Sequence, residues 1–402
     1  MGHPPRLVAI HQARWPSADR PARWLEGSIT LQDGRIEQLR PQEASPGAPE
    51  PGPVLDAAGC TLLPGFVDVH VHGGDGFDTM DATPEALLGM ARFFARHGVT
   101  AFCPTTITAP QEAIRRAVAN VAQVLESTPE ERWPGARILG VHLEGPYISP
   151  QYPGAQPAQF IREPDVAEFL ELVAAGPVSL ITLAPEQPGA AALIAAALQH
   201  GVGVVLGHTA ASYDQAVAAI RQGASQATHT FNAMTGLHHR RPGMVGAVLS
   251  QDAIRAQLIA DNIHVHPAVM DILGRCKGVE GTILITDAMR AAGLPPGQYD
   301  LGGQTVTVAE GACRLANGSL AGSILTMDRA LANFLAATGW PLEQGWPVSS
   351  RTPARSLGLG QEMGAVAPGY RADLVLLDED LQVVATVVGG RLVYLRDEER
   401  LG

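Results

Sequence analysis

Residues 66–72 alternate apolar and polar side chains, which predicts an extended strand with Asp68, His70 and His72 on one face. Both histidines lie at the carboxyl end of this strand, where Gly73 and Gly74 follow. Neutral imidazole nitrogens bind divalent zinc well, and this spacing lets two rings converge on one ion. The alternative interpretation is a pair of ordinary surface or core histidines. Polar residues elsewhere in the chain decide between the two.

Four more residues suited to metal binding or proton transfer follow apolar runs of the same kind. Glu144 lies in His-Leu-Glu-Gly-Pro, His208 in Gly-His-Thr, His229 in Thr-His-Thr-Phe-Asn-Ala-Met, and Asp287 in Thr-Asp-Ala. Each one alone has an ordinary explanation, such as a turn cap, a satisfied core histidine or a helix N-cap at Asp287. Six such residues at strand ends are improbable as independent accidents, so the sequence favours a metal site.

The elements that must position these residues alternate in type. We expect strands at 66–72, 100–104, 138–144, 178–183, 202–208, 226–230, 256–260 and 283–287. We expect helices at 84–97, 110–125, 165–174, 188–200, 213–222, 267–275 and 325–337. This pattern predicts an α/β fold, a (β/α)8 TIM-type barrel, whose chemistry lies at the carboxyl ends of its strands. A six-stranded doubly wound sheet is the alternative, but it gives no reason for eight units.

The two ends of the chain show short strand patterns and no long helix. Residues 7–10, 27–31 and 35–39 alternate, with a hairpin signal at Asp33-Gly34, and a Pro- and Gly-rich loop is expected from Pro41 to Pro53. Residues 372–377, 381–388 and 391–395 read as strands too. Neither end can build a core alone. We therefore predict one small β-sandwich domain from residues 1–58 and 360–402, flanking a catalytic barrel at 59–359.

Composition narrows the compartment and the partners. The net charge of −12 argues against a nucleic acid or an anionic membrane surface as partner, since both attract clustered Lys and Arg. The 4 cysteines are scattered without a Cys-x-x-Cys pair, which fits a reducing compartment with thiols as small core residues. The chain shows no apolar signal core in its first 30 residues and no uninterrupted run of membrane-spanning length. We expect a cytoplasmic protein.

The chemistry of this residue set is hydrolytic. Histidines and a carboxylate hold one or two divalent ions and leave a position open for water, whose pKa the metal lowers towards about 7. Asp287 can accept a proton from the water molecule that attacks as hydroxide, and it can later deliver this proton to a leaving group. A carbonyl oxygen would be polarised in the same geometry. The expected reaction is hydrolysis of an amide-like or related bond.

Longer motifs carry a resemblance over nearly the whole chain. They are Pro-Gly-Phe-Val-Asp-Val-His-Val-His-Gly-Gly at 64–74, His-Leu-Glu-Gly-Pro at 142–146, Gly-His-Thr at 207–209, Thr-His-Thr-Phe-Asn-Ala-Met at 228–234, Arg-Arg-Pro-Gly at 240–243, Thr-Asp-Ala at 286–288, Asn-Gly-Ser-Leu-Ala-Gly-Ser at 317–323 and Pro-Gly-Tyr-Arg-Ala-Asp-Leu at 368–374. The sequence resembles the amidohydrolase superfamily and, more narrowly, is similar to N-acetylglucosamine-6-phosphate deacetylases. The resemblance implies hydrolysis of N-acetyl-D-glucosamine 6-phosphate to D-glucosamine 6-phosphate and acetate.

The resemblance also implies roles for the six residues. Glu144, His208 and His229 would hold the principal metal ion, and Asp287 would be the general base and acid. Some members replace both histidines of the His-x-His pair and use one metal. This chain keeps them, so a second ion at His70 and His72, shared through Glu144, is expected. Zinc is the first choice, and Fe²⁺, Mn²⁺ or Co²⁺ suit the same ligands.

Substrate contacts carry over motif by motif. Asn232 and Ala233 would touch the sugar phosphate, Arg240 would pair with phosphate, and His264 would touch sugar or phosphate. Gln156 stands where some members carry histidine and can still hydrogen-bond hydroxyls. The expected substrate-binding residues are Ala155, Gln156, Asn232, Ala233, Arg240, His264, Leu320, Ala321, Gly322 and Ser323.

The loop His238-His-Arg-Arg241 is the densest cationic cluster of this acidic chain. Arginine offers a bidentate fork for phosphate oxygens, although a solvated loop is the alternative. In the family one such basic residue reaches across a dimer interface, so the resemblance implies a homodimer. Two other functions stay open: an amidohydrolase acting on an N-acyl amino acid or a cyclic amide, and a non-catalytic binding or scaffold barrel.

Overall fold

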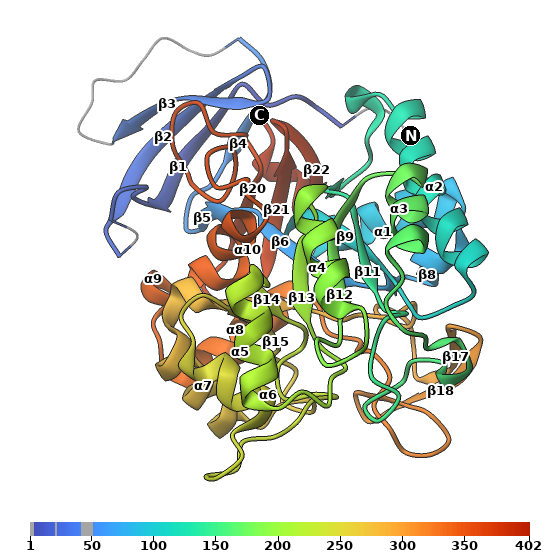
Figure 1. The fold of residues 1–402 in the computed structure, drawn as a ribbon. Helices are drawn as coiled ribbons and strands as arrows, with labels where there is room; N and C mark the ends of the chain where they lie inside the picture. The colour runs from blue at the N-terminus through green and yellow to red at the C-terminus, as the bar shows by residue number, and fades with distance from the viewer. Residues whose placement is uncertain (1–3, 21, 42–50) are drawn as a thin grey trace.

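Parallel strands from the middle of the chain form the predicted barrel (Figure 1). This computed structural model describes residues 4–20, 22–41 and 51–402, so most of the expected loop from Pro41 to Pro53 lies outside the described residues. In hydrogen-bonded order the strands are β6 (Phe66–Val71), β9 (Val99–Thr106), β11 (Val141–Glu144), β12 (Val178–Leu183), β13 (Gly203–Leu206), β14 (Gln226–Ala227), β15 (Arg255–Ile259) and β16 (Thr282–Ile285). β10 (Arg137–Ile138) also pairs with β9, so the third predicted strand is interrupted.

The circle closes where the last strand meets the first. The Asp287 N–H, just beyond β16, donates to the His70 carbonyl of β6 at 3.0 Å. This bond brings the His-x-His pair next to the proposed acid/base residue, although 217 positions separate His70 from Asp287 in the sequence (287 minus 70). The barrel fold is confirmed, and the carboxyl ends of its strands meet at one rim.

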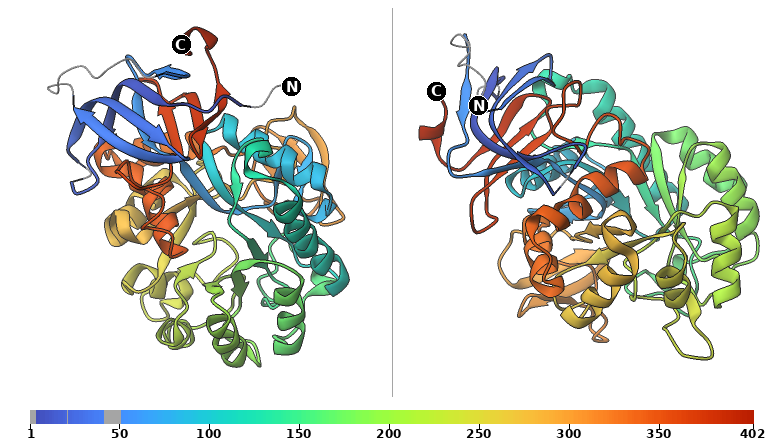
Figure 2. Two further views of the ribbon diagram at one scale, coloured as in Figure 1. Left: turned by 90° about the horizontal axis from the view of Figure 1, so that it is seen from above. Right: turned by 90° about the vertical axis from the view of Figure 1, so that its left-hand side faces the viewer.

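Helices cover the outside of the barrel (Figure 2). They are α1 (Pro84–Arg96), α2 (Gln111–Ser127), α3 (Val166–Ala175), α4 (Ala190–Gln199), α5 (Tyr213–Gln222), α6 (Gly243–Ser250), α7 (Pro267–Gly281), α8 (Met327–Thr338), α9 (Leu342–Gly345) and α10 (Arg351–Ser356). Short 3-10 turns are η1 (Thr79–Asp81), η2 (Glu130–Arg132), η3 (Ala158–Phe160), η4 (Trp346–Ser349) and η5 (Glu398–Arg400). α6 was not predicted, because its eight residues include Gly243 and Gly246 and give no polar face to mark a helical period.

The α1 segment shows how the sequence fixes this layer. The side chain of Thr83 caps the helix by accepting a hydrogen bond from the Ala86 N–H. Pro84 begins the helix at a position where a backbone N–H would have no partner within the helix. The buried face of the helix carries Phe94, whose ring meets that of Phe102 in β9 edge to face at 4.9 Å. This contact ties α1 to the strand that follows it.

Truncating this contact should destabilise the barrel. Phe102 is completely buried, so Phe102→Ala is expected to lower the free energy of unfolding by about 3–5 kcal/mol through lost burial and a residual cavity. Leu125 on α2 is 39% exposed, and Leu125→Ala should change the free energy of unfolding by no more than about 0.5 kcal/mol. Urea unfolding of both variants measures this, and equal destabilisation would contradict it.

Both chain ends contribute to a second, mostly antiparallel sheet, seen in blue and red in Figure 1. Its strands are β1 (Ala9–Pro16), β2 (Trp24–Gln32), β3 (Arg35–Pro41), β4 (Val54–Asp56), β5 (Thr61–Pro64), β20 (Leu374–Leu377), β21 (Val383–Val388) and β22 (Arg391–Leu395). β20 and β5 join the two ends, and a separate apolar cluster around Trp15 and Leu374 fills this sheet's core. β5 belongs to this sheet although it lies beyond residue 58. The division of the chain into domains at 58/59 and 359/360 stays a prediction.

A small insertion between β16 and α8 covers the rim and was not predicted. It contains the three-stranded antiparallel sheet β17 (Gly297–Leu301), β18 (Gln304–Ala309) and β19 (Ala312–Arg314), which we call the cap. A third apolar cluster joins Leu301 and Val306 of the cap to Ile107 and Met289 of the barrel loops. The cap therefore packs against the barrel.

A two-stranded hairpin, β7 (Gly73–Gly74) with β8 (Phe77–Asp78), follows the first barrel strand.

The expectations drawn from composition have partial outcomes. No helix among the described residues combines the length and apolarity that crossing a membrane requires. Cys60, Cys103 and Cys313 are buried free thiols, as expected for small core residues. Cys276 is exposed on α7, so the core prediction is wrong for this one thiol.

Candidate active site

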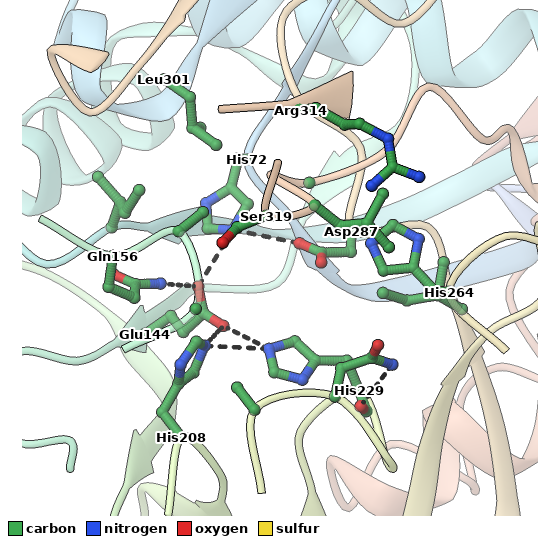
Figure 3. A pocket seen from close by; sticks show the side chains of 18 of the residues that line it. His72, Glu144, Gln156, His208, His229, His264, Asp287, Leu301, Arg314 and Ser319 are labelled. Carbon is green, nitrogen blue, oxygen red and sulfur yellow. Dashed lines mark hydrogen bonds and ion pairs between the residues drawn. The ribbon is translucent and has the colours of Figure 1, made fainter. Parts of the chain in front are cut away.

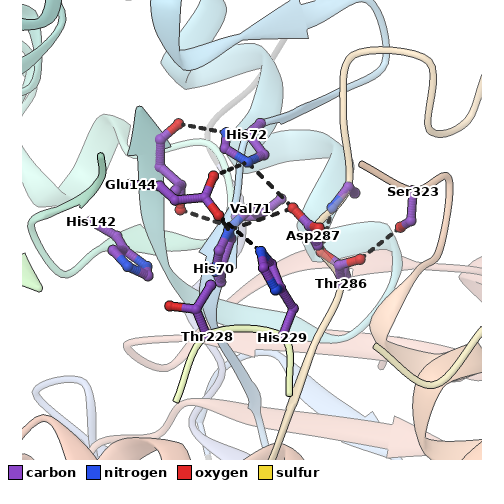
Figure 4. A network of polar contacts seen from close by, with 12 residues as sticks. His70, Val71, His72, His142, Glu144, Thr228, His229, Thr286, Asp287 and Ser323 are labelled. Atoms are coloured by element: carbon purple, nitrogen blue, oxygen red, sulfur yellow. Dashed lines mark hydrogen bonds and ion pairs between the residues drawn. The ribbon is translucent and has the colours of Figure 1, made fainter. Parts of the chain in front are cut away.

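The six predicted residues meet at the rim in two adjoining clusters (Figures 3 and 4). Within each cluster the potential ligand atoms lie within 4.8 Å of one another. All six residues are buried. The clusters are His70, His72 and Asp287 on one side, and Glu144, His208 and His229 on the other.

Glu144 lies between the two clusters and faces both. Its Oε1 lies 3.2 Å from Nε2 of His208, 3.1 Å from Nε2 of His229 and 3.4 Å from Nε2 of His70. Its Oε2 lies 3.2 Å from Nε2 of His72. One carboxylate can therefore serve two ions, as the sequence-based hypothesis of a shared ligand requires.

The surroundings of the imidazoles fit metal binding. Nδ1 of His208 lies 3.0 Å from the Tyr152 carbonyl and Nδ1 of His72 lies 3.2 Å from the Thr105 carbonyl, so each Nδ1 donates to a carbonyl and each Nε2 is turned towards the carboxylates. Nε2 of His208 and Nε2 of His229 face each other at 3.1 Å. Nε2 of His70 is buried without a hydrogen-bond partner. Ring nitrogens and carboxylate oxygens that converge this closely are a donor set that fits a divalent cation.

Charge completes this donor set. Burial raises the pKa of the Glu144 carboxyl, but the charge of the His70 ring and hydrogen bonds with its neighbouring imidazoles outweigh burial and hold the pKa well below its usual range. Burial also raises the pKa of Asp287, while the hydrogen bond with His72 and the charges of both His-x-His rings bring it below its ordinary value. Both carboxyl groups are therefore ionised, the form that binds a divalent ion or accepts a proton.

His142 supports the site from beneath, as its place on the strand of Glu144 suggests. Its Nδ1 lies 2.9 Å from the Val69 carbonyl and its Nε2 lies 2.8 Å from Oγ1 of Thr182. Burial lowers the pKa of His142 to about 3, so the ring is neutral at physiological pH. It packs edge to face on His70 with ring centroids 4.7 Å apart and holds that ring in place.

Three of the functional residues adopt left-handed backbone conformations. φ is +50° at His208, +24° at His229 and +49° at Asp287. Such conformations are rare for residues with side chains and persist only where the surrounding structure imposes them. At Asp287 the two peptide bonds are tied down, since its N–H donates to His70 at 3.0 Å and its carbonyl accepts the Ser323 N–H at 2.7 Å. This conformation turns the carboxylate towards the rim.

A cavity of about 390 Å³ opens above the clusters (Figure 3). A volume in this range suits a small ligand of sugar-phosphate size. Many of the predicted residues line it: His72, Glu144, Ala155, Gln156, His208, His229, Asn232, Ala233, His264, Asp287, Leu320 and Gly322. The rest of the predicted set does not line it: His70, Arg240, Ala321 and Ser323.

These four residues lie elsewhere for identifiable reasons. His70 is completely buried and reaches the site through the cluster that it forms with His72 and Asp287. Ala321 is buried in the apolar cluster of the cap, and Ser323 donates from Oγ to the Thr286 carbonyl at 2.6 Å. Arg240 is exposed on its loop, with Nη1 2.8 Å from Nε2 of His239. A contact between Arg240 and phosphate is therefore not made within this chain and stays a prediction for a neighbouring subunit.

Sequence reasoning missed five side chains of the cavity: Ile107, Ile259, Leu301, Arg314 and Ser319. Leu301 and Arg314 come from the cap, whose strands were not predicted. Alternation in 304–309 after the turn Gly302-Gly303 is a hairpin signal that could have revealed it. Arg314 is the one Lys or Arg among the described residues that line this cavity. It gives the pocket of an acidic protein a positive charge from its own chain.

The class of this protein follows from a comparison with known protein families. The sequence profile of the Amidohydrolase family matches residues 61–393, which covers the barrel and both metal-fitting clusters. The chain therefore belongs to the amidohydrolase family, whose enzymes hydrolyse substrates with the help of divalent metal ions. Together with the donor set described above, this membership makes the rim the candidate divalent-metal site of a hydrolase.

The similarity narrows further within that family to the deacetylases of N-acetylated sugar phosphates. The chain is 42% identical over 366 residues to the N-acetylglucosamine-6-phosphate deacetylase of Lysinibacillus sphaericus, covering 90% of this chain and 92% of that one. It is 43% identical over 372 residues to the N-acetylgalactosamine-6-phosphate deacetylase of Escherichia coli O157:H7, covering 92% and 95%. A mutant deacetylase of Mycobacterium smegmatis, solved with N-acetyl-D-glucosamine-6-phosphate, superposes with a TM-score of 0.87 at 33% identity, covering 96% and 99%.

Proposed function

We propose that the chain hydrolyses the acetamide of N-acetyl-D-glucosamine 6-phosphate and releases acetate and D-glucosamine 6-phosphate. The observation that carries this proposal is the ionised Asp287 at the cavity floor, beside two metal-fitting clusters that share Glu144. The relatives supply the substrate class. The alternative of a scaffold barrel and the alternative of an N-acyl amino acid or cyclic amide as substrate gain no support from the lining of the cavity.

Zinc is the metal we propose, with Glu144, His208 and His229 holding the principal ion and the His-x-His pair a second one. When bound, the divalent ion acts as a Lewis acid and lowers the pKa of water towards about 7. Asp287 accepts the proton of the attacking water at its carboxylate. It then delivers this proton to the amine nitrogen as the carbon–nitrogen bond breaks. The pKa of Asp287, which lies below its ordinary value, keeps the base ionised before the first step.

The two sides of the cavity differ in polarity, which orients the substrate. In Figure 3 the Arg314 guanidinium and the His264 ring lie towards one side, while the apolar side chain of Leu301 lies towards the other. We propose that the 6-phosphate lies on the side of Arg314 and that Ile107 and Leu301 receive the acetyl methyl. The charge of Arg314 and the imidazole of His264 support an anion there.

Arg314→Gln should weaken recognition of the phosphate. A hydrogen bond to a charged group contributes about 1.5–3 kcal/mol, so kcat/KM for the phosphorylated sugar should fall by roughly 10- to 100-fold, chiefly through KM. The same variant should hydrolyse unphosphorylated N-acetylglucosamine at the wild-type kcat/KM. Steady-state acetate release from both compounds measures the difference, and an equal loss on both would rule out a phosphate contact.

The His-x-His pair should decide whether a second ion binds. The double variant His70→Gln, His72→Asn is expected to lose about one metal ion per subunit and to keep part of its activity, because the other cluster retains its ligands. Elemental analysis of the purified variant measures this. Loss of all metal would instead show that the pair forms the primary site.

A panel of N-acetyl compounds tests the proposed substrate. Acetate release should be fastest with N-acetylglucosamine 6-phosphate and slow with N-acetylglucosamine and N-acetyl amino acids. The 43% identity to the Escherichia coli enzyme makes N-acetylgalactosamine 6-phosphate the second candidate substrate, so it belongs in the panel. Indifference to the 6-phosphate would contradict the proposal.

We also propose a cytoplasmic homodimer in which Arg240 of one subunit reaches the neighbouring cavity. The exposure of the Arg240 loop and of Leu237, which is 61% exposed, supports an interface on this face. Light scattering at micromolar concentration tests it. A monomer with full activity would overturn both the dimer and the role of Arg240.

A further inference from the structure

Gln156 is expected from the sequence to contact substrate hydroxyls, yet both ends of its amide are engaged within the protein. Its Oε1 accepts the backbone N–H of Thr108 at 2.7 Å, and its Nε2 donates to Oε2 of Glu144 at 2.6 Å. The Thr108 N–H can only donate, so it fixes which end of the amide is oxygen. The side chain is 7% exposed. Figure 3 shows the amide aimed at Glu144.

The bond to Gln156 falls on the carboxylate oxygen that faces His72 of the His-x-His pair. Oε2 of Glu144 lies 3.2 Å from Nε2 of His72, whereas Oε1 lies 3.2 Å from Nε2 of His208, 3.1 Å from Nε2 of His229 and 3.4 Å from Nε2 of His70. The last torsion of a glutamate is broad and nearly two-fold, so nothing intrinsic to Glu144 fixes the plane of its carboxylate. A donor on one oxygen alone does fix it.

Gln156 is itself held on both sides. Its N–H donates to the Pro153 carbonyl at 2.9 Å, and Nε2 of Gln304 in the cap donates to the Ala155 carbonyl at 2.6 Å. Both the loop after β11 and the cap therefore fix the amide in space. A residue held in this way can impose an orientation on its neighbour, because it does not adjust to it.

We propose that Gln156 is a positioning residue that sets the plane of the Glu144 carboxylate and thereby turns Oε2 towards His72 and Oε1 towards His208 and His229. Gln156 donates one hydrogen to Oε2 and leaves that oxygen a second lone pair for the ion beside His72. This role rests on the proposed metal-dependent function. It differs from a substrate contact, because it acts on metal affinity in the absence of substrate.

The variant Gln156→Met tests the role, since it keeps the length of the side chain and removes the amide. Loss of a group that orients a metal ligand typically lowers metal affinity by about 10- to 100-fold, so equilibrium dialysis against buffered free zinc should show that shift for the second ion. The kcat should fall with it, while KM changes by less than about threefold. Gln156→His, which again offers a ring N–H to Oε2, should recover part of the affinity.

Gln111→Met is the matched control. Nε2 of Gln111 donates to Oε2 of Glu171 at 2.5 Å, the same type of bond in an exposed position at the start of α2, and neither residue lines the cavity. Its loss should leave zinc affinity unchanged. A cycle with His72→Asn sharpens the test, because the effect of Gln156→Met should shrink once the partner of Oε2 is gone.

Each outcome counts for or against the role. Wild-type zinc affinity in Gln156→Met with a raised KM would overturn it in favour of a substrate contact, and wild-type values throughout would overturn it outright. If Gln156→Met does not fold, Gln156→His decides through the same zinc titration: near-wild-type affinity supports the role and loss of the second ion overturns it. A wild-type protein that binds no zinc would instead refute the proposed metal-dependent function.

Discussion

The variant Asp287→Asn is expected to lower kcat for acetate release by about 10²–10⁴-fold, the range that a positioned acid/base group contributes. Asparagine keeps the shape of the side chain and its backbone bonds to His70 and Ser323, but its amide cannot take up the proton of the attacking water. The principal cluster, which does not include Asp287, should keep its metal ion. Single-turnover acetate release and elemental analysis on the same sample separate the two effects.

Asp300→Asn controls for the change in charge, since the side chain of Asp300 is 53% exposed and lies outside the cavity lining. This variant should keep the wild-type kcat. If Asp287→Asn stays within about threefold of the wild-type rate, Asp287 is not the acid/base residue.

The second large effect is expected from Glu144→Gln, because this carboxylate faces both clusters. A neutral amide of the same shape removes the charge that both ions share. Since a bound metal contributes several kcal/mol of stabilisation to the transition state, acetate release should fall by at least about 10³-fold. Metal content should fall below that of the His70→Gln, His72→Asn protein, which loses ligands from one cluster only.

Glu171→Gln is the control for Glu144→Gln, because Glu171 lies on the exposed side of α3. It should retain the wild-type metal content and rate. Full metal occupancy in Glu144→Gln would contradict the idea that Glu144 is the shared ligand.

The barrel and the residues on its rim could be predicted from the sequence, and the reason is physical. Parallel strands buried on both faces are continuous apolar runs, and a polar residue at the end of such a run stands out. Glu144, His208, His229 and Asp287 were found in this way. Their convergence then needed only the rule that the carboxyl ends of barrel strands share one rim.

What the sequence did not reveal depends on contacts between distant segments. The cap strands are short, and they pack on the barrel through Ile107 and Leu301. The local pattern of apolar and polar residues therefore does not predict that Arg314 lines the cavity. Gln156 looked like a substrate contact because its loop position was clear, whereas its bond to Thr108, 48 positions away, was not visible. Residue type and position were predictable, but the partner of each side chain was not.

The most direct test of the account is acetate release from N-acetylglucosamine 6-phosphate by protein stripped of metal and then titrated with zinc. We predict that the stripped protein is inactive and that zinc restores the release of acetate and glucosamine 6-phosphate in equal amounts, with activity rising as the first ion binds. Wild-type release by protein shown to contain no metal, or no release with any divalent ion, would contradict the central claim.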